Sequence, residues 1–541
     1  MKKLLFFVFS LISVGVYAQT QITSAAQLQS MSLDGNYILM NDIDFSSSTF
    51  NPIGGQYGKS FTGTFDGNGH TITIRDVSTD YTYRGLFSQI GSEGVVKNLK
   101  VKGSLDNAPE NGCFVGGIAA WNSGTITNCS SSVYINSSRT SGTNAWICRS
   151  GCIAGINNGT INYCFADGGM YGAKNNEGTG GIVGKNANNN AKIENCIYIG
   201  SIERYYSDTN GGKYGMICGY TDGYVQYITN CYYLEGTGMT GLGSYSKSSP
   251  TADDGHCTAL SQFDIRALAR TGGVYASTTN DVFKNAILSF SYTIDFKASD
   301  GLAIFNSIKG EPANVTFRRD ATKDKKCTIC LPFNIPIEQA NNVGKFYEFI
   351  GIKSGTTDVA QMTQVTSDLQ ANTAYVWEPK YGYSEDPQYT GIQFKNVTIA
   401  NTLTPVAGSG TFQFIGTYED KTWTASDPDL GKVYGFAIAG YESSGFTNGQ
   451  FVILGAGASA APFRAYLKYV PDASSAPRRT SVTLPNILNI EWISADNVTS
   501  ISNVNRPTSD NGWFTLDGRK LNGTPTKKGI YVNNGKKVLV K

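Results

Sequence analysis

Short apolar segments, each opened by a glycine, recur along the first half of the chain. The five segments begin at Gly85, Gly116, Gly151, Gly180 and Gly215 and end at Leu99, Cys129, Cys164, Cys196 and Cys231. Their last positions advance by 30, 35, 32 and 35 residues, a period typical of stacked supersecondary units. The segments alternate in polarity and are rich in Ile, Val, Thr and Tyr, which favours strands over helices. Because one such unit cannot bury its inner face alone, residues 19–240 are predicted to form a parallel β-helix.

A bend is predicted inside each repeat. Four isoleucines stand three residues before the repeat cysteine: Ile126, Ile161, Ile193 and Ile228. On a flat strand this spacing would place the two side chains on opposite faces, so both point inward only if the chain bends between them. Asparagine, which tolerates the left-handed conformation, precedes three of the cysteines (Asn128, Asn195 and Asn230). The third repeat has Tyr163 there, and we expect its corner to differ.

The repeat cysteines are predicted to form an inward column of free thiols. Neighbouring coils lie about 4.8 Å apart, close enough for disulfides, but stacked side chains run parallel and pack more naturally as small hydrophobic groups. The four concerned are Cys129, Cys164, Cys196 and Cys231.

The segments ahead of the repeats carry a more specific pattern, found in Tyr37–Asp44, Pro52–Gly54 and Phe61–His70. Together with the Gly-Leu-Phe and Gly-Ile-Val-Gly segments, they resemble the GLUG-repeat proteins. This resemblance implies a right-handed β-helix, a surface or adhesin context and no catalytic residues. It also implies a closing helix within Ala259–Ala269.

The second half lacks the repeat. Residues 241–285 are predicted to hold a linker and the closing helix, and residues 286–490 a β-sandwich-like region. Strands are expected at Val315–Arg318, Thr328–Phe333, Ala374–Trp377, Phe412–Gly416 and Arg464–Tyr469. The predicted fold class is therefore all-β throughout.

Both ends of the chain resemble export signals. Residues 1–18 have the charged start, apolar centre and small-residue cleavage site of a signal peptide. Residues 491–541 contain Leu516-Asp517-Gly518-Arg519 and a terminal hairpin through Asn534-Gly535, and look like a type IX secretion sorting domain. That resemblance implies outer-membrane secretion machinery as a partner. We expect an extracellular or cell-surface protein that is not integral to a membrane, and its net charge of +2 argues against nucleic acid as a partner.

Candidate chemistry is sparse. Between Gly85 and Glu235, no two acidic residues on adjacent coils stand at the same distance from the repeat cysteine, which argues against hydrolase or lyase chemistry on the coils. Asp42, Asp44, Asp66 and His70 could bind a metal, but a structural role at the start of the β-helix is favoured. Cys327 and Cys330 have redox spacing within a predicted strand, so a disulfide or two buried thiols is expected. No catalytic residue, metal or cofactor is predicted.

The tyrosines near the last repeat are the remaining candidates for ligand contact. Most are expected to pack, but a possible glycan-contacting set consists of Tyr205, Tyr206, Tyr220 and Tyr224. The leading functional hypothesis is a non-catalytic, adhesin-like protein that binds a glycan or a host surface protein through the β-helix. A polysaccharide lyase or glycoside hydrolase on the β-helix is one alternative, and a purely structural surface component is another.

Overall fold

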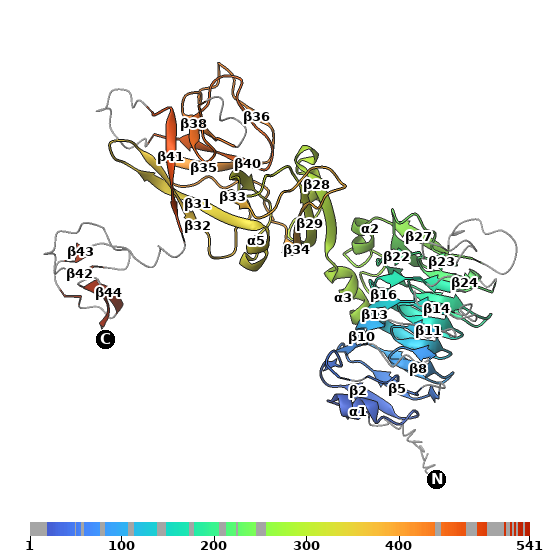
Figure 1. Cartoon of the computed structure of the whole chain (residues 1–541). Coiled ribbons are helices and arrows are strands. Elements are labelled where there is room, and N and C mark those ends of the chain that lie inside the picture. The colour runs from blue at the N-terminus through green and yellow to red at the C-terminus, as the bar shows by residue number, and fades with distance from the viewer. Residues whose placement is uncertain are drawn as a thin grey trace, which may run out of the picture. The chain divides into compact units, whose positions relative to one another are not determined.

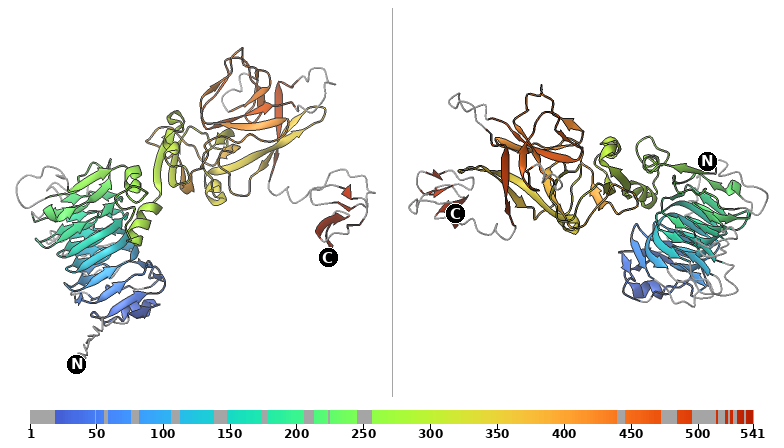
Figure 2. Two further views of the ribbon diagram at one scale, coloured as in Figure 1. Left: turned by 180° about the vertical axis from the view of Figure 1, so that it is seen from behind. Right: turned by 45° about the horizontal axis from the view of Figure 1, so that its top comes forward.

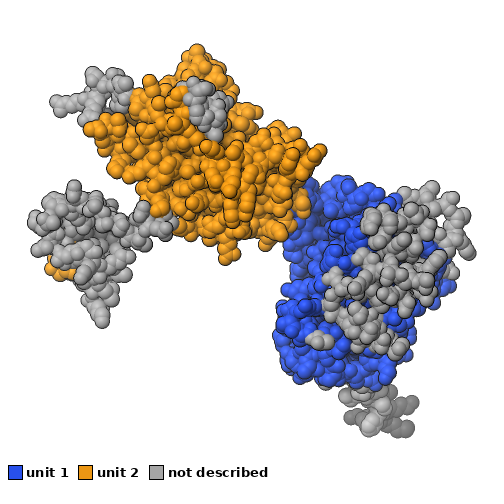
Figure 3. Space-filling view, in the orientation of Figure 1, with its two compact units in different colours: residues 1–292 blue, residues 293–541 orange. Residues whose placement is uncertain are grey.

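A computed structural model shows two compact units, residues 1–292 and 293–541, coloured separately in Figure 3. It describes residues 19–540 except 49, 56–58, 76–81, 106–112, 138–147, 173–177, 205–212, 223–224, 245–255, 439–444, 472–483, 495–512, 515–519, 522–523, 526–528 and 534–535. Strands take up 46% of the structure and helices 9%. The predicted all-β fold class, with a parallel β-helix in the N-terminal unit, is confirmed.

The central coils of the β-helix contain three limbs each, and equivalent limbs of successive coils pair in parallel (Figure 1). In one coil these limbs are β11 (Cys113–Gly116), β12 (Ala119–Asn122) and β13 (Thr125–Asn136). The next coil repeats them in register, with Gly116 opposite Gly151 and Ile126 opposite Ile161. The stack places one continuous apolar core inside the coils.

Three sheets result from this stacking. The first limbs form a five-stranded sheet of β7 (Tyr83–Arg84), β11, β14 (Cys148–Gly151), β18 (Gly178–Gly180) and β23 (Tyr214–Gly215). The second limbs form a six-stranded sheet of β4 (Ser60–Phe61), β8 (Phe87–Ile90), β12, β15 (Ala154–Asn157), β19 (Val183–Asn186) and β24 (Cys218–Thr221). The third limbs form a sixteen-stranded sheet, which holds β1 (Thr20–Ile22), β2 (Asn36–Leu39), β3 (Ile43–Asp44), β5 (Thr64–Asp66), β6 (Thr71–Ile74), β9 (Val95–Lys97), β10 (Lys100–Leu105), β13, β16 (Thr160–Ala166), β17 (Met170–Tyr171), β20 (Lys192–Glu194), β21 (Ile197–Tyr198), β22 (Ile202–Glu203), β25 (Ile228–Thr229), β26 (Cys231–Leu234) and β27 (Cys257–Leu260). The short 3₁₀ turn η1 (Val225–Tyr227) precedes β25.

The third limb bends where the sequence predicted it. Asn128, Asn195 and Asn230 have φ values of 51°, 54° and 52°. Tyr163 has a φ of 50°, so the expectation of a different corner in that coil is wrong. The bend is imposed by the parallel pairing on both sides of it, and the Tyr163 ring packs edge-on against Phe283 at a centroid distance of 5.5 Å. Packing thus offsets the strain of a left-handed tyrosine.

The inward column of thiols is confirmed. Cys129, Cys164, Cys196 and Cys231 are buried and free. Each Sγ donates to the carbonyl oxygen two residues before it in its own strand, for example Cys129 to Thr127 at 3.2 Å and Cys196 to Glu194 at 3.2 Å. Burial is the main cause that raises the pKa of the Cys164, Cys196 and Cys231 thiols. A further cysteine, Cys257, lies opposite Cys231 and extends the column by one coil.

The β-helix continues past residue 240, into the segment expected to be a linker. Leu242 is buried and pairs with Cys218, and β27 pairs in parallel with β26. Helix α1 (Ala25–Gln29) covers the first coil with Leu28. Helix α2 (Gln262–Ala267) lies within the stretch expected to close the array, and α3 (Asp281–Ser289) packs along the flank of the sixteen-stranded sheet (Figures 1 and 2).

The second unit begins with a three-stranded sheet followed by a folded nine-stranded sheet. The first comprises β28 (Tyr292–Lys297), β29 (Pro312–Arg318) and β34 (Ile392–Thr398), with η2 (Ala298–Asp300) and α4 (Ala303–Asn306) between β28 and β29. The second runs in the order β30 (Cys327–Cys330), β33 (Ala374–Pro379), β31 (Gly344–Lys353), β32 (Val359–Gln364), β41 (Ile487–Ile493), β38 (Phe451–Ile453), β37 (Val433–Phe436), β40 (Arg464–Tyr469) and β35 (Phe412–Thr417). The short strands β36 (Lys421–Thr422) and β39 (Ser459–Ala460) and helix α5 (Ile337–Val343) complete it. Its two halves enclose one core, in which Met362 and Val376 face Phe414 and Leu467, as the sandwich prediction requires.

The last residues form a separate small sheet, in the order β43 (Lys520–Leu521), β42 (Trp513–Phe514), β44 (Gly529–Asn533) and β45 (Lys536–Val540). Asn533 lies opposite Lys536, so two residues connect the final strands, as the hairpin prediction requires. The expected signal peptide, residues 1–18, lies outside the described residues.

Candidate functional site

A polar groove lies between the outer face of the sixteen-stranded sheet and helix α3. Side chains alternate along β10 and β13, so Val101 and Ser131 are buried while Lys102 and Ser132 are exposed. Parallel register places Lys100 beside Ser130 and Lys102 beside Ser132 on adjacent coils. The cavity measures about 270 Å³. We call it the α3 groove, and its polar lining comprises Thr71, Lys100, Lys102, Ser130, Ser132, Asp167, Asn285 and Ser289.

Two aromatic rings belong to the apolar part of the α3 groove, together with Val101, Val282 and Ala286. Phe165 of β16 stacks on Phe290, which follows α3, with ring planes 18° apart and centroids at 6.3 Å. Helix α3 is held there by its buried face and by the Phe283 backbone N–H, which donates to Asn128 Oδ1 at 2.9 Å. The asparagine at the coil corner therefore also positions the wall of the groove.

Asp167 provides the carboxylate among the groove-lining residues. Ser132 Oγ donates to Asp167 Oδ1 at 2.5 Å, across one coil. Partial desolvation raises the pKa of Asp167, although the residue as a whole is exposed, which limits the size of the shift. The groove thus combines the carboxyl group of Asp167 with the amino groups of Lys100 and Lys102.

The acidic cluster considered for a metal has structural partners. Asp42 Oδ1 accepts from the Thr71 N–H at 2.9 Å and lies 3.2 Å from His70 Nδ1, and the Thr71 bond lowers the pKa of Asp42. Asp44 accepts from the Ser46 N–H at 2.7 Å, which lowers its pKa likewise. Asp66 accepts from the Asn68 N–H and pairs with Lys97 Nζ at 3.4 Å. Within the described part of the chain, no three His, Cys, Asp or Glu side chains gather in a metal-binding arrangement.

Of the four tyrosines proposed to contact glycan, the structure describes Tyr220; Tyr205, Tyr206 and Tyr224 lie outside the described residues. Lys213 Nζ lies 3.7 Å from the centroid of the Tyr220 ring, and Lys185 Nζ lies 5.1 Å from it. Lys185 also pairs with Asp222 at 3.0 Å. Because a sugar would need the ring face that Lys213 contacts, this geometry favours a packing role for Tyr220.

Cys327 and Cys330 are two buried, free thiols on β30, as one of the two expected alternatives proposed. Burial raises the pKa of Cys330 to about 12, which keeps it protonated. A reactive thiol requires the opposite, a lowered pKa, so Cys330 does not fit a redox role.

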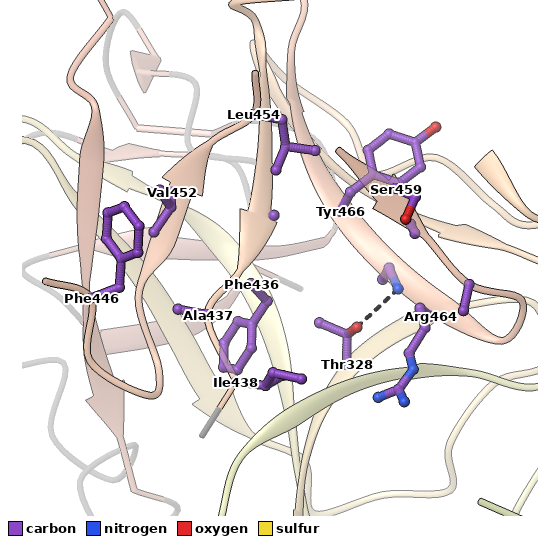
Figure 4. A pocket seen from close by; sticks show the side chains of 14 residues that line it. Thr328, Phe436, Ala437, Ile438, Phe446, Val452, Leu454, Ser459, Arg464 and Tyr466 are labelled. Atoms are coloured by element: carbon purple, nitrogen blue, oxygen red, sulfur yellow. Dashed lines mark hydrogen bonds between the residues drawn. The ribbon is translucent and has the colours of Figure 1, made fainter. Parts of the chain in front are cut away.

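A larger cavity of about 490 Å³ opens in the second unit, where β37 and β40 diverge (Figure 4). The two strands pair at Val433 and Tyr434 and then separate. Phe436, Ile438 and Leu454 line the cavity, while Thr328 and Arg464 lie at one side of it. Its mainly apolar lining suits an apolar ligand better than a sugar.

The α3 groove was not found from the sequence, because its lysines, serines and aspartate come from three coils and one helix. One available signal was the equivalent position of Lys100 and Ser130, each just after the residue that ends its repeat. The docking of α3 on that face has no comparable sequence signature.

Comparisons with known proteins add little. No family model matches the chain. A stretch of 105 residues, 18% of the chain, is 36% identical to halomucin of Haloquadratum walsbyi, and it spans about 1% of that protein's length. A solved structure described as a "putative immunoglobulin A1 protease" from Bacteroides ovatus aligns with 46% of this chain and 86% of its own, at 17% identity and a TM-score of 0.30. Neither similarity is extensive enough to carry an argument about activity. None of the described helices is long and apolar enough to cross a membrane.

Proposed function

We propose that this protein is a non-catalytic surface or secreted protein whose β-helix binds a glycan, with one sugar ring seated in the α3 groove. The supporting observation is the combination of groove-lining groups: a carboxylate, two ammonium groups and two serine hydroxyls beside the Phe165–Phe290 stack. Adjacent sugar hydroxyls both donate and accept hydrogen bonds, which such a set of groups can satisfy. Phe165 and Phe290, with 2% and 8% of their surfaces exposed, form an apolar wall and not an open stacking platform. The volume of about 270 Å³ lies near the lower limit of small-molecule pockets, about 300 Å³, and suits one ring.

The number of carboxyl groups in the α3 groove favours binding over hydrolysis. A glycosidase uses two carboxyl groups flanking the bond to be cleaved, about 5 to 9.5 Å apart. The groove lining contributes one, Asp167, already engaged by Ser132. Export to the surface rests on the resemblance of residues 1–18 to a signal peptide and of the β-helix to GLUG-repeat proteins, which also supports the adhesin-like role.

Asp167→Asn is expected to weaken glycan binding about tenfold or more, because the charged acceptor is lost. A glycan array probed with the full chain would select the ligand, and calorimetry would then measure the affinities. Glu203→Gln is the matched control, since it removes one carboxylate from the exposed end of β22 on the same sheet. An equal loss of affinity in both variants, or no binding to any glycan, would contradict the proposal. Release of reducing sugar from a glycan would instead indicate an enzyme.

The C-terminal sheet is proposed to be a type IX sorting domain. Deletion of residues 513–541 is expected to abolish surface delivery while leaving the melting temperature of the β-helix unchanged, because coils contact only their neighbours. Cell fractionation and surface proteolysis, paired with thermal unfolding, test both parts. A truncated protein that still reaches the surface would disprove the sorting role, whereas a lowered melting temperature would assign the hairpin a structural one.

A further inference from the structure

Two cysteines outside the thiol column face each other across neighbouring coils. Cys113 begins β11, Cys148 begins β14, and the two residues are direct partners in the parallel ladder. Their sulfur atoms lie 3.1 Å apart. Both side chains are buried, with 0% and 1% of their surfaces exposed.

The thiol column provides an internal comparison. Cys129 and Cys164 are also direct partners in adjacent coils, yet each Sγ is directed at a carbonyl of its own strand, at 3.2 Å and 3.5 Å. The thiols of the column thus have backbone carbonyl oxygens as hydrogen-bond acceptors. Cys113 and Cys148 share the spacing of the column, but the contact recorded for their sulfur atoms is with each other, at 3.1 Å.

We propose that Cys113 and Cys148 form a disulfide that joins two adjacent coils of the β-helix. Paired strands lie about 4.8 Å apart, inside the range of Cα separations that a disulfide spans. Bond formation needs the sulfurs to approach from 3.1 Å to about 2.0 Å, a movement that side-chain rotation at a strand end can supply.

The oxidation is a two-electron thiol–disulfide exchange with a disulfide oxidant. One thiolate attacks an oxidant sulfur, which forms a mixed disulfide and releases one thiol. The other thiolate then attacks the protein sulfur of that mixed disulfide and releases the second thiol. The two protein thiols lose two protons and two electrons, and the oxidant becomes two thiols. Because burial excludes the oxidant from the stacked coils, the bond forms while the coils assemble.

The full chain should therefore be refolded with glutathione disulfide and, in parallel, with a reductant. After oxidative refolding and denaturation, nine of its eleven thiols are expected to react with a thiol reagent, and peptide mass mapping should locate the bond at Cys113 and Cys148. Reduction should lower the melting temperature of the β-helix by about 5 °C or more. Eleven reactive thiols, or a bond mapped to another pair, would overturn the proposal.

Two variants distinguish the effect of losing the disulfide from the effect of removing a buried thiol. The double variant C113S/C148S is expected to keep nine reactive thiols and to show a melting temperature that no longer depends on reductant. Cys129→Ser is the matched control: it removes a buried thiol from the same coil and should retain the reductant dependence. If the double variant fails to fold, mass mapping of the wild-type chain still decides the question.

Discussion

Replacing Asn157 with alanine is expected to lower the free energy of unfolding of the β-helix by about 3 to 5 kcal/mol. Asn157 is fully buried at the end of β15 and stands between Asn122 and Asn186 of the adjacent coils. Its amide nitrogen donates to Asn186 Oδ1 at 2.9 Å, and its amide oxygen accepts from Asn122 Nδ2 at 2.8 Å. The three asparagines thus form a continuous ladder along the axis of the β-helix.

The cost is large because several buried groups lose partners at once. Asn157 Nδ2 also donates to the carbonyl oxygens of Gly159 and Lys192, and its Oδ1 accepts from the Gly159 N–H at 3.2 Å. Alanine supplies none of these bonds, and each buried polar group left unpaired costs about 1 to 3 kcal/mol. The site is closed to water that could replace the amide.

Urea unfolding measures the loss, and hydrogen exchange should localise it to β12, β15 and β19. Asn190→Ala is the matched control, because Asn190 is exposed in a turn of the neighbouring coil. Loss of less than about 1 kcal/mol at Asn157, or uniform exchange across the unit, would show that the ladder does not stabilise adjacent coils.

The sequence was most informative where the repeat itself encodes the structure. Ile126 and Cys129 recur in register, so their inward orientation and the left-handed corner between them followed from spacing alone. The prediction for the Tyr163 corner was wrong. It considered which residue types tolerate the left-handed conformation, but not the parallel pairing on both sides, which fixes the backbone there. Cys257 was missed because it follows Cys231 by 26 residues, outside the repeat period.

The candidate site was least accessible to sequence reasoning. The α3 groove depends on a helix more than 100 residues downstream, and hydrophobicity does not specify the face on which that helix docks. The number of tyrosines near the last repeat suggested a glycan contact, whereas the position of Lys213 over the Tyr220 ring, which favours packing, has no sequence pattern. When residues at non-repeating positions make a contact between coils, no pattern in the nearby sequence indicates it.

Gly151→Ala is expected to destabilise the β-helix by about 3 kcal/mol or more, or to prevent the surrounding coils from folding. Gly151 ends β14 at the tight corner before β15, in register with Gly116 and Gly180. An added Cβ would lie 2.3 Å from the Ala154 carbonyl oxygen and 2.6 Å from that of Ile182. Both contacts are with backbone of the same or the next coil, which cannot move away without breaking the parallel ladder.

This close approach accounts for the glycine that opens each repeat, since the first and second limbs meet there with no room for a side chain. Gly169→Ala is the matched control, because the nearest atom to its added Cβ is a ring carbon of the exposed Tyr134 side chain, at 3.2 Å. Urea unfolding should leave the control within about 1 kcal/mol of the wild type. Soluble yield and hydrogen exchange report on Gly151→Ala if it does not fold completely. Wild-type stability in that variant would mean that the corner can open, and that these glycines are not needed to let successive coils stack.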